Sequence, residues 1–95
     1  MNNATNIFRF DLGMLLSTQG ADALLRSVNH SPLQYLARHR RGDWGDISSD
    51  DIQANESALQ LGGRILSAYK IGEHRLWVIT EADRSSTTLL LPSEY

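Results

Sequence analysis

The stretch RILSAYKIGEHRLWVITEADRSSTTLLL (residues 64–91) decides the fold of this chain. Its content of β-branched and aromatic residues predicts three strands, at residues 64–71, 76–81 and 87–91. The tight Gly-Glu turn after residue 71 makes the first two strands an antiparallel hairpin, and the polar residues 82–86 form a longer second connection. Residues 76–79 are apolar on both faces, which predicts a central strand with cover on each side.

Three helix patterns precede these strands. Thr18 and Ser31 stand where N-cap residues are preferred, and Ser31 is followed by a proline suited to the first helical position. Ser48 or Ser49 caps a third helix, whose first turn carries two aspartates near the positive end of the helix dipole. Gly62 ends this helix.

Helices followed by strands predict an α+β fold, with about three N-terminal helices packed on a C-terminal three-stranded antiparallel meander. Residues 7–12 alternate loosely between apolar and polar side chains and are bounded by Gly13. A short N-terminal strand added to the sheet is therefore an open alternative.

The composition indicates a single globular domain spanning residues 1–95. Of the 95 residues, 41% are hydrophobic and 21% charged, and the formal net charge is −2; these values are typical of globular proteins. The absence of cysteine excludes disulfide frameworks and thiolate metal sites. There is no apolar run near the ~18–20 residues of a membrane span, and no secretory signal. We therefore expect a cytoplasmic protein with no membrane partner.

A dense polar cluster follows the second helix pattern and comprises Arg38, His39, Arg40, Arg41, Asp43, Trp44 and Asp46. Its arginines can bind phosphate, and Trp44 can stack on a base. The structural alternative is that the cations decorate a helix C-terminus while Trp44 anchors the loop in the core, and we favour this reading of Trp44. Further candidate partner-binding carboxylates, which make an acidic surface with Asp43 and Asp46, are Asp50, Asp51 and Glu56.

A second polar cluster joins the last two predicted strands. In the functional interpretation Arg84 clamps a phosphate or oxyanion, Glu81 acts as a general base and Thr87 orients the scissile group. Asp83 is a candidate binding residue in the same turn. The structural interpretation, which we favour, is turn chemistry with a surface ion pair.

Other polar residues indicate structure rather than chemistry. Asn55, Glu56 and Arg64 predict a structural polar network, in which Glu56 pairs with Arg64 at the junction of helix and strand. The three histidines lack metal-ligand spacing, and Gly62-Gly63 lacks the pattern of a phosphate-binding loop. We expect no metal and no cofactor.

Several motifs resemble a family of small bacterial proteins carried largely by plasmids and other mobile elements. They are HxxGDWG at residues 39–45, Asn55-Glu56, RILSAY at residues 64–69 and WVITEADRSSTTLLLPSEY at residues 77–95. The resemblance extends from Phe10 to Tyr95 and implies no assigned activity.

The order of helices and meander is more distantly similar to the barnase–EndoU–colicin–RelE ribonucleases, which cut RNA without a metal. Those enzymes use an acid–base pair and a cationic clamp on the phosphate. This similarity implies His39 as general acid or base, Arg84 as the clamp and Thr87 as an orienting hydroxyl. It is a likeness of topology and not of motifs.

Two functions therefore remain open. We favour a small interaction protein of a mobile element that binds and inhibits a host-defence complex, such as a restriction or CRISPR system, through an exposed apolar or acidic patch. The alternative is a metal-independent ribonuclease, or a degenerate relative, with His39, Arg84 and Thr87 in one concave site. The net charge disfavours general RNA binding, although the basic run at residues 38–41 leaves a local phosphate site open. A third hypothesis is a homodimer paired through an uncovered sheet edge.

Overall fold

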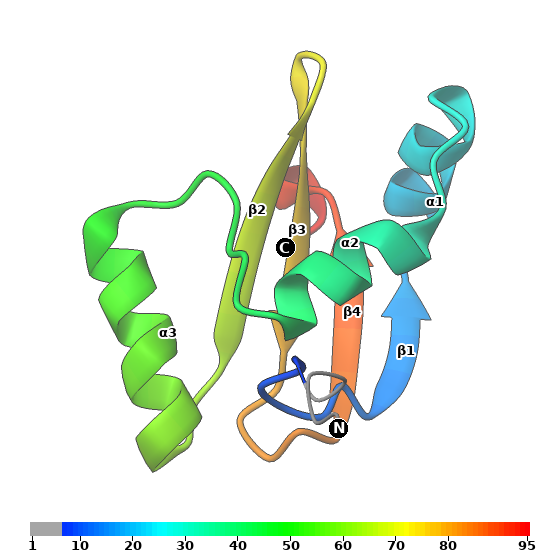
Figure 1. The fold of residues 1–95 in the computed structure, drawn as a ribbon. Coiled ribbons are helices and arrows are strands. Elements are labelled where there is room, and N and C mark those ends of the chain that lie inside the picture. Colours follow the sequence, from blue (N-terminus) through cyan, green and yellow to red (C-terminus); the bar gives the residue numbers. More distant parts are fainter. Residues whose placement is uncertain (1–6) are drawn as a thin grey trace.

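A four-stranded mixed sheet forms the centre of the fold in the computed structural model, which describes residues 7–95 (Figure 1). The strands are β1 (Met14–Ser17), β2 (Ile65–Ile71), β3 (His74–Thr80) and β4 (Ser86–Leu90), in the spatial order β1-β4-β3-β2. The predicted α+β class and the antiparallel β2-β3-β4 meander are confirmed, with β3 inside the sheet. The sheet is nevertheless not purely antiparallel, because β1 adds a fourth strand parallel to β4.

The added strand lies later in the chain than its predicted position at residues 7–12, which form no strand. It begins after Gly13, whose φ is 67° and where a Cβ would collide with the backbone of Arg84 and Ser85. Glycine therefore lets the chain pass tightly against the β3–β4 connection. The Met14 amide then donates to the carbonyl of Ser85 at 2.9 Å, and pairing with β4 starts there.

The helices are α1 (Gln19–Ser27), α2 (Pro32–Arg40) and α3 (Ser49–Leu61), and a 3₁₀ turn, η2 (Pro92–Glu94), follows β4. The predicted caps are confirmed at Thr18, Ser31 and Ser48, whose side chains each accept a hydrogen bond from a first-turn amide. Gly62, with φ 87°, ends α3 as predicted.

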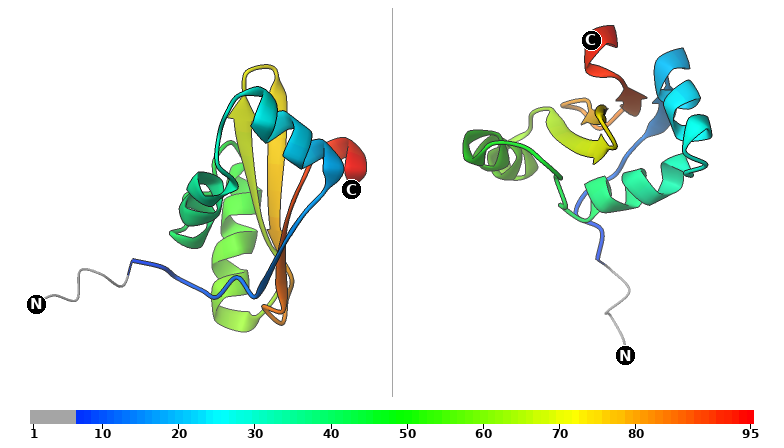
Figure 2. Two further views of the ribbon diagram at one scale, coloured as in Figure 1. Left: turned by 90° about the vertical axis from the view of Figure 1, so that its right-hand side faces the viewer. Right: turned by 90° about the horizontal axis from the view of Figure 1, so that it is seen from above.

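The helices are distributed unevenly over the sheet. In Figure 1, α2 crosses in front of β3 and β4, while α1 and α3 lie toward opposite edges of the sheet. The view from above shows η2 on the face opposite α2 (Figure 2). Within residues 7–95, one face of the sheet is thus covered by helices and the other only by the short turn η2.

The apolar core lies under α1 and α2 and has a smaller extension beside α3. The main cluster joins these two helices to the sheet and contains Ala21, Leu24, Leu25, Tyr35, Leu36, Tyr69, Ile71, Leu76, Val78 and Leu89. The extension is built on Trp44, Ala58 and Ile65, with Phe10, Ile47 and Leu59 packed against it. Within residues 7–95, none of the helices combines the length and apolarity needed to cross a membrane.

Candidate functional site

His39, the predicted acid–base residue, lies at the end of α2 and is fully buried. Its Nδ1 is 2.6 Å from Ser67 Oγ on β2, and its Nε2 is 2.9 Å from Thr80 Oγ1 on β3. Thr80 Oγ1 is 2.7 Å from Thr87 Oγ1 on β4, which donates to the carbonyl of Leu12 at 2.7 Å. We call this connected set the histidine chain.

The donor directions in the histidine chain follow from its last bond. Because the Thr87 hydroxyl donates to a carbonyl, it accepts from Thr80, and Thr80 in turn accepts from Nε2–H of His39. Nδ1 is then the acceptor and receives the hydroxyl proton of Ser67. A neutral imidazole satisfies every member of the set.

Burial lowers the pKa of His39 from 6.5 to about 3, so the ring is neutral at pH 7. Desolvation is the cause, and no charged partner contributes. A perturbed pKa is common among catalytic residues, but here both ring nitrogens of His39 are already bonded within the core. The arrangement favours a structural role over proton exchange with a substrate.

Arg84, the predicted clamp, is hydrogen-bonded to backbone carbonyl oxygens. It lies in the turn before β4 at φ 60°, and its guanidinium donates at 2.6–3.0 Å to four carbonyl oxygens, those of Ala58, Gly63, Glu81 and Ala82. These carbonyls belong to the end of α3, the residue after its cap, and the β3–β4 turn. Arg84 therefore ties the last turn of α3 to the sheet, which is a structural role but not the surface ion pair that the structural interpretation predicted.

Phe10 separates Arg84 from the histidine chain. The Arg84 guanidinium lies 5.9 Å from the centroid of the Phe10 ring, and the Phe10 and His39 rings pack edge to face with centroids 5.2 Å apart. Thr87 is fully buried. The three proposed nuclease residues are thus near one another, but His39 and Thr87 are enclosed and Arg84 faces carbonyl oxygens.

The remaining carboxylates of the two clusters are mostly neutralised by neighbours. Asp43 pairs with Arg38 at 2.7 Å, and Asp46 pairs with Arg75 at 2.8 Å and Lys70 at 3.4 Å. The hydrogen bond from Arg38 holds the pKa of Asp43 below its ordinary value. The acidic surface is therefore reduced to two aspartates.

Those two aspartates are Asp50 and Asp51, exposed in the first turn of α3. Arg40 pairs with Asp11 at 3.3 Å, and Arg41 is exposed after α2. Asp83 accepts the backbone amide of Ser85 at 3.0 Å in the β3–β4 turn.

The predicted pairing of Glu56 with Arg64 is wrong. Glu56 instead accepts from both terminal nitrogens of Arg9, at 2.8 and 3.0 Å. Arg64 lies 3.5 Å from Glu81, so the predicted general base is the surface ion partner of a different arginine. The partner was missed because Arg9 is far from Glu56 in the sequence.

Trp44 packs inward as its structural interpretation predicts, whereas Asn55 is bonded to β2 and not within the predicted network with Glu56 and Arg64. Trp44 is only 5% exposed, and its ring packs against Phe10 and His39 with centroids 6.2 and 5.9 Å apart. Asn55, also buried, donates from Nδ2 to the carbonyl of Leu66 at 2.7 Å and accepts the amide of Leu66 at 3.0 Å. The Asn55 side chain thus bonds β2 as a neighbouring strand would.

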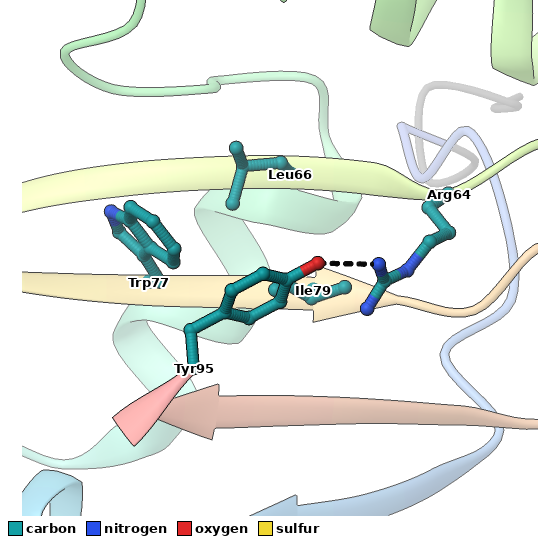
Figure 3. Close-up of a pocket in the computed structure, with 5 residues that line it drawn as sticks. All are labelled: Arg64, Leu66, Trp77, Ile79 and Tyr95. Atoms are coloured by element: carbon teal, nitrogen blue, oxygen red, sulfur yellow. Dashed lines mark hydrogen bonds between the residues drawn. The ribbon is translucent and has the colours of Figure 1, made fainter. Parts of the chain in front are cut away.

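A pocket that the sequence did not predict lies on the open face of the sheet (Figure 3). Its volume is about 210 Å³ and its lining is Arg64, Leu66, Trp77, Ile79 and Tyr95. The Tyr95 ring meets Trp77 edge to face at 5.6 Å, and its hydroxyl accepts from Arg64 Nη1 at 2.7 Å. Figure 3 shows the Tyr95 ring projecting over β3 between Trp77 and Arg64. We call this site the Tyr95 pocket.

The only sequence signal for the Tyr95 pocket was the apolar character of both faces of β3. The helix side of β3 is covered by α2, whereas among the described residues the other side is covered by η2 and Tyr95 (Figures 1 and 2). Trp77 therefore remains partly exposed, and Tyr95 is 68% exposed.

No family model, curated protein or solved structure matches this chain. Within the described residues, no group of three or more histidine, aspartate or glutamate side chains is placed to hold a metal ion.

Proposed function

We propose that this protein is a non-enzymatic protein-binding module whose binding surface is centred on the Tyr95 pocket. One observation carries the proposal: the pocket brings Arg64, Trp77 and Tyr95 together at an accessible surface. Tryptophan, tyrosine and arginine are the residue types that dominate the binding energy of protein interfaces.

The chemistry of the pocket suits a protruding apolar side chain of a partner. Leu66, Trp77 and Ile79 form its floor, and a volume of about 210 Å³ accommodates one large aliphatic or aromatic group. The side chain of Arg64 is about half exposed beside Tyr95, and it offers a hydrogen-bond donor at the rim.

The distribution of polar groups supports binding over catalysis. His39 and Thr87 are buried in the histidine chain, and Arg84 is bonded to carbonyl oxygens. A ribonuclease needs such groups exposed to the scissile phosphate. The ribonuclease alternative therefore has less support than binding.

The resemblance to mobile-element proteins suggests the class of partner. We propose a subunit of a host-defence complex, of the restriction or CRISPR kind, whose activity is blocked when its surface is occupied. This proposal draws on the resemblance, and the pocket supports only the binding step.

Affinity capture with matched variants tests the proposal. The bait is the purified chain, compared with Tyr95→Ala and with Leu61→Ala as a control; Leu61 is 85% exposed at the end of α3. We expect a stoichiometric protein to be retained by wild type and Leu61→Ala and to be reduced at least about tenfold with Tyr95→Ala. Equal retention by Tyr95→Ala, or no retained protein, contradicts the proposal.

Two further measurements test the proposed partner class and the proposed lack of enzymatic activity separately. A restriction or CRISPR subunit among the proteins lost with Tyr95→Ala supports the proposed partner class, and its absence contradicts that class. Incubation of the wild-type chain with total RNA tests the non-enzymatic part. Intact RNA is expected, and cleavage that copurifies with the folded protein overturns it.

A further inference from the structure

The outer edge of β1 is open. β1 pairs with β4 alone among the described strands. The amides of Met14 and Thr18 donate toward β4, to the carbonyls of Ser85, just before that strand, and of Leu89 within it, at 2.9 and 3.0 Å. Because backbone groups alternate along a strand, the N–H and C=O groups of Leu15 and Ser17 point away from the sheet.

The side chains along this edge are apolar and exposed. Met14, Leu15 and Leu16 are 65%, 49% and 44% exposed, and Leu33 on α2 is 64% exposed. A groove of about 140 Å³ between β1 and α2 is lined in part by Leu15, Pro32 and Leu33. Natural edge strands usually carry a charge, a proline or a covering element that prevents pairing. β1 has the sequence MLLS, which contains neither a charged residue nor a proline.

We propose that β1 pairs antiparallel with β1 of a second copy of this chain, which forms a homodimer with one continuous eight-stranded sheet. The register follows from the outward-pointing groups. A two-fold axis at Leu16 places Leu15 of each copy opposite Ser17 of the other, where each such pair exchanges two backbone hydrogen bonds.

The edge is self-complementary in this arrangement. Leu16 faces Leu16 of the second copy at the closer, non-hydrogen-bonded type of pair. β1 has no charged residue that would face its equal across the axis. A second copy therefore supplies the apolar, uncharged, extended segment that the edge and its groove require, and one patch serves both sides, as a two-fold interface demands.

The arrangement of faces has a consequence for binding. A two-fold axis perpendicular to the sheet keeps both open faces on the same side, so the two Tyr95 pockets would share one surface. This consequence rests on the proposed function, whereas the dimer itself does not. A partner with two copies of its epitope would then bind bivalently.

Analytical ultracentrifugation from about 1 to about 200 μM tests the dimer, because a short strand pair buries little area and its dissociation constant is expected near micromolar. We expect a concentration-dependent dimer for wild type. Leu16→Lys places two ammonium groups opposite each other and should weaken the dimer at least about tenfold. Leu61→Lys is the matched control and should dimerise as wild type. A wild-type monomer at all concentrations, or a dimer unchanged by Leu16→Lys, overturns the proposal.

A mixing experiment shows whether the loss of dimerisation in Leu16→Lys is caused only by misfolding. Leu16→Lys and Leu16→Glu are each expected to be monomeric and, when mixed, to form a heterodimer through opposite charges at the axis. Failure of the mixture to dimerise, with both variants folded by circular dichroism, contradicts the register. If either variant is unfolded, Met14→Lys replaces it as the edge variant, and retention of a wild-type dimer by folded Met14→Lys overturns the involvement of this edge. Capture of partners through the Tyr95 pocket is measured separately, so failure of one proposal leaves the other distinguishable.

Discussion

The two edges of the sheet differ in how their backbone groups are satisfied. At the β2 edge, Asn55 bonds both backbone groups of Leu66, and the loop at residues 44–46 bonds both groups of Ala68, at 3.0 Å from the Trp44 carbonyl and 2.7 Å from the Asp46 amide. At the β1 edge no described element takes this place. The backbone groups are therefore satisfied within the chain at the β2 edge, whereas at the β1 edge they are exposed to solvent and free to pair.

The covered edge is continuous with the polar interior. Ser67 on β2 belongs to the histidine chain, and the His39 ring packs against Trp44, which begins the covering loop. Residues with the strongest chemical signature in the sequence therefore build the closed side of the molecule. The two surfaces proposed for binding, the Tyr95 pocket and the β1 edge with its groove, are lined mostly by apolar side chains.

The largest effect on stability is expected from removal of the His39 imidazole, which joins the loop at residues 44–46, α2 and the sheet. His39→Ala leaves the hydroxyls of Ser67 and Thr80 without their partner and creates a cavity, so we expect the free energy of unfolding to fall by about 3–4 kcal/mol. Urea denaturation measures this change. His74→Ala, at an exposed position of the hairpin, is the control and should change stability by less than about 0.5 kcal/mol. A loss below about 1 kcal/mol for His39→Ala would show that the histidine chain is not structural.

The pH dependence of stability is a second test of the structural role of His39. The folded pKa of His39 is about 3 against 6.5 for the free side chain, so below about pH 6.5 the unfolded chain binds a proton that the folded chain does not. Stability is therefore fully present above this pH and is lost as the pH falls toward 3. Between pH 7 and pH 5 the loss is about 2 kcal/mol from this group.

His39→Gln is the matched variant for the pH measurement, because the glutamine amide keeps polar atoms next to Ser67 and Thr80 but removes the titrating ring. Urea denaturation at several pH values should show a smaller slope for His39→Gln than for wild type. Identical slopes would mean that His39 is accessible to protons in the folded protein, which would favour the ribonuclease alternative.

The sequence predicted the elements whose signals are local. The caps at Thr18, Ser31 and Ser48 were found because an N-cap bonds an amide only two or three residues away, and the hairpin because its turn residues adjoin its strands. β1 was misplaced because its partner, β4, lies at the other end of the chain. Nothing within residues 7–17 distinguishes an extended segment from a paired strand.

The candidate site was predicted less well than the fold, for a similar reason. His39 and Arg84 have side chains suited to chemistry, and only three-dimensional contacts show that one is enclosed and the other bonded to carbonyl oxygens. Trp44 was interpreted correctly because a large aromatic in a short loop tends to pack inward. The Tyr95 pocket was missed because the cover on each face of β3 depends on where the helices lie.

Opening the covered edge is expected to have a smaller effect. Asn55→Ala removes the side chain that bonds Leu66, and water replaces it only in part, so we expect a loss of about 1–2 kcal/mol. Hydrogen exchange at the Leu66 amide should accelerate in the same variant. Gln53→Ala, an exposed position of the same helix, is the control. An unchanged exchange rate at Leu66 would show that Asn55 does not protect this edge.

The smallest effect is expected at the open edge itself. Met14 is 65% exposed, and its side chain has little burial to lose in the monomer, so Met14→Lys should change the free energy of unfolding by less than about 0.5 kcal/mol. The measurement must be made well below the dimerisation range, because a dimer adds stability that depends on concentration. At higher concentration the wild type should gain stability and Met14→Lys should gain less. A large loss of unfolding free energy in the dilute Met14→Lys monomer would mean that the side chains of β1 already stabilise this edge within one copy. The two edges would then differ less than proposed. A small loss, together with a concentration-dependent difference, identifies the open edge as a surface whose stabilising contacts come from a second molecule.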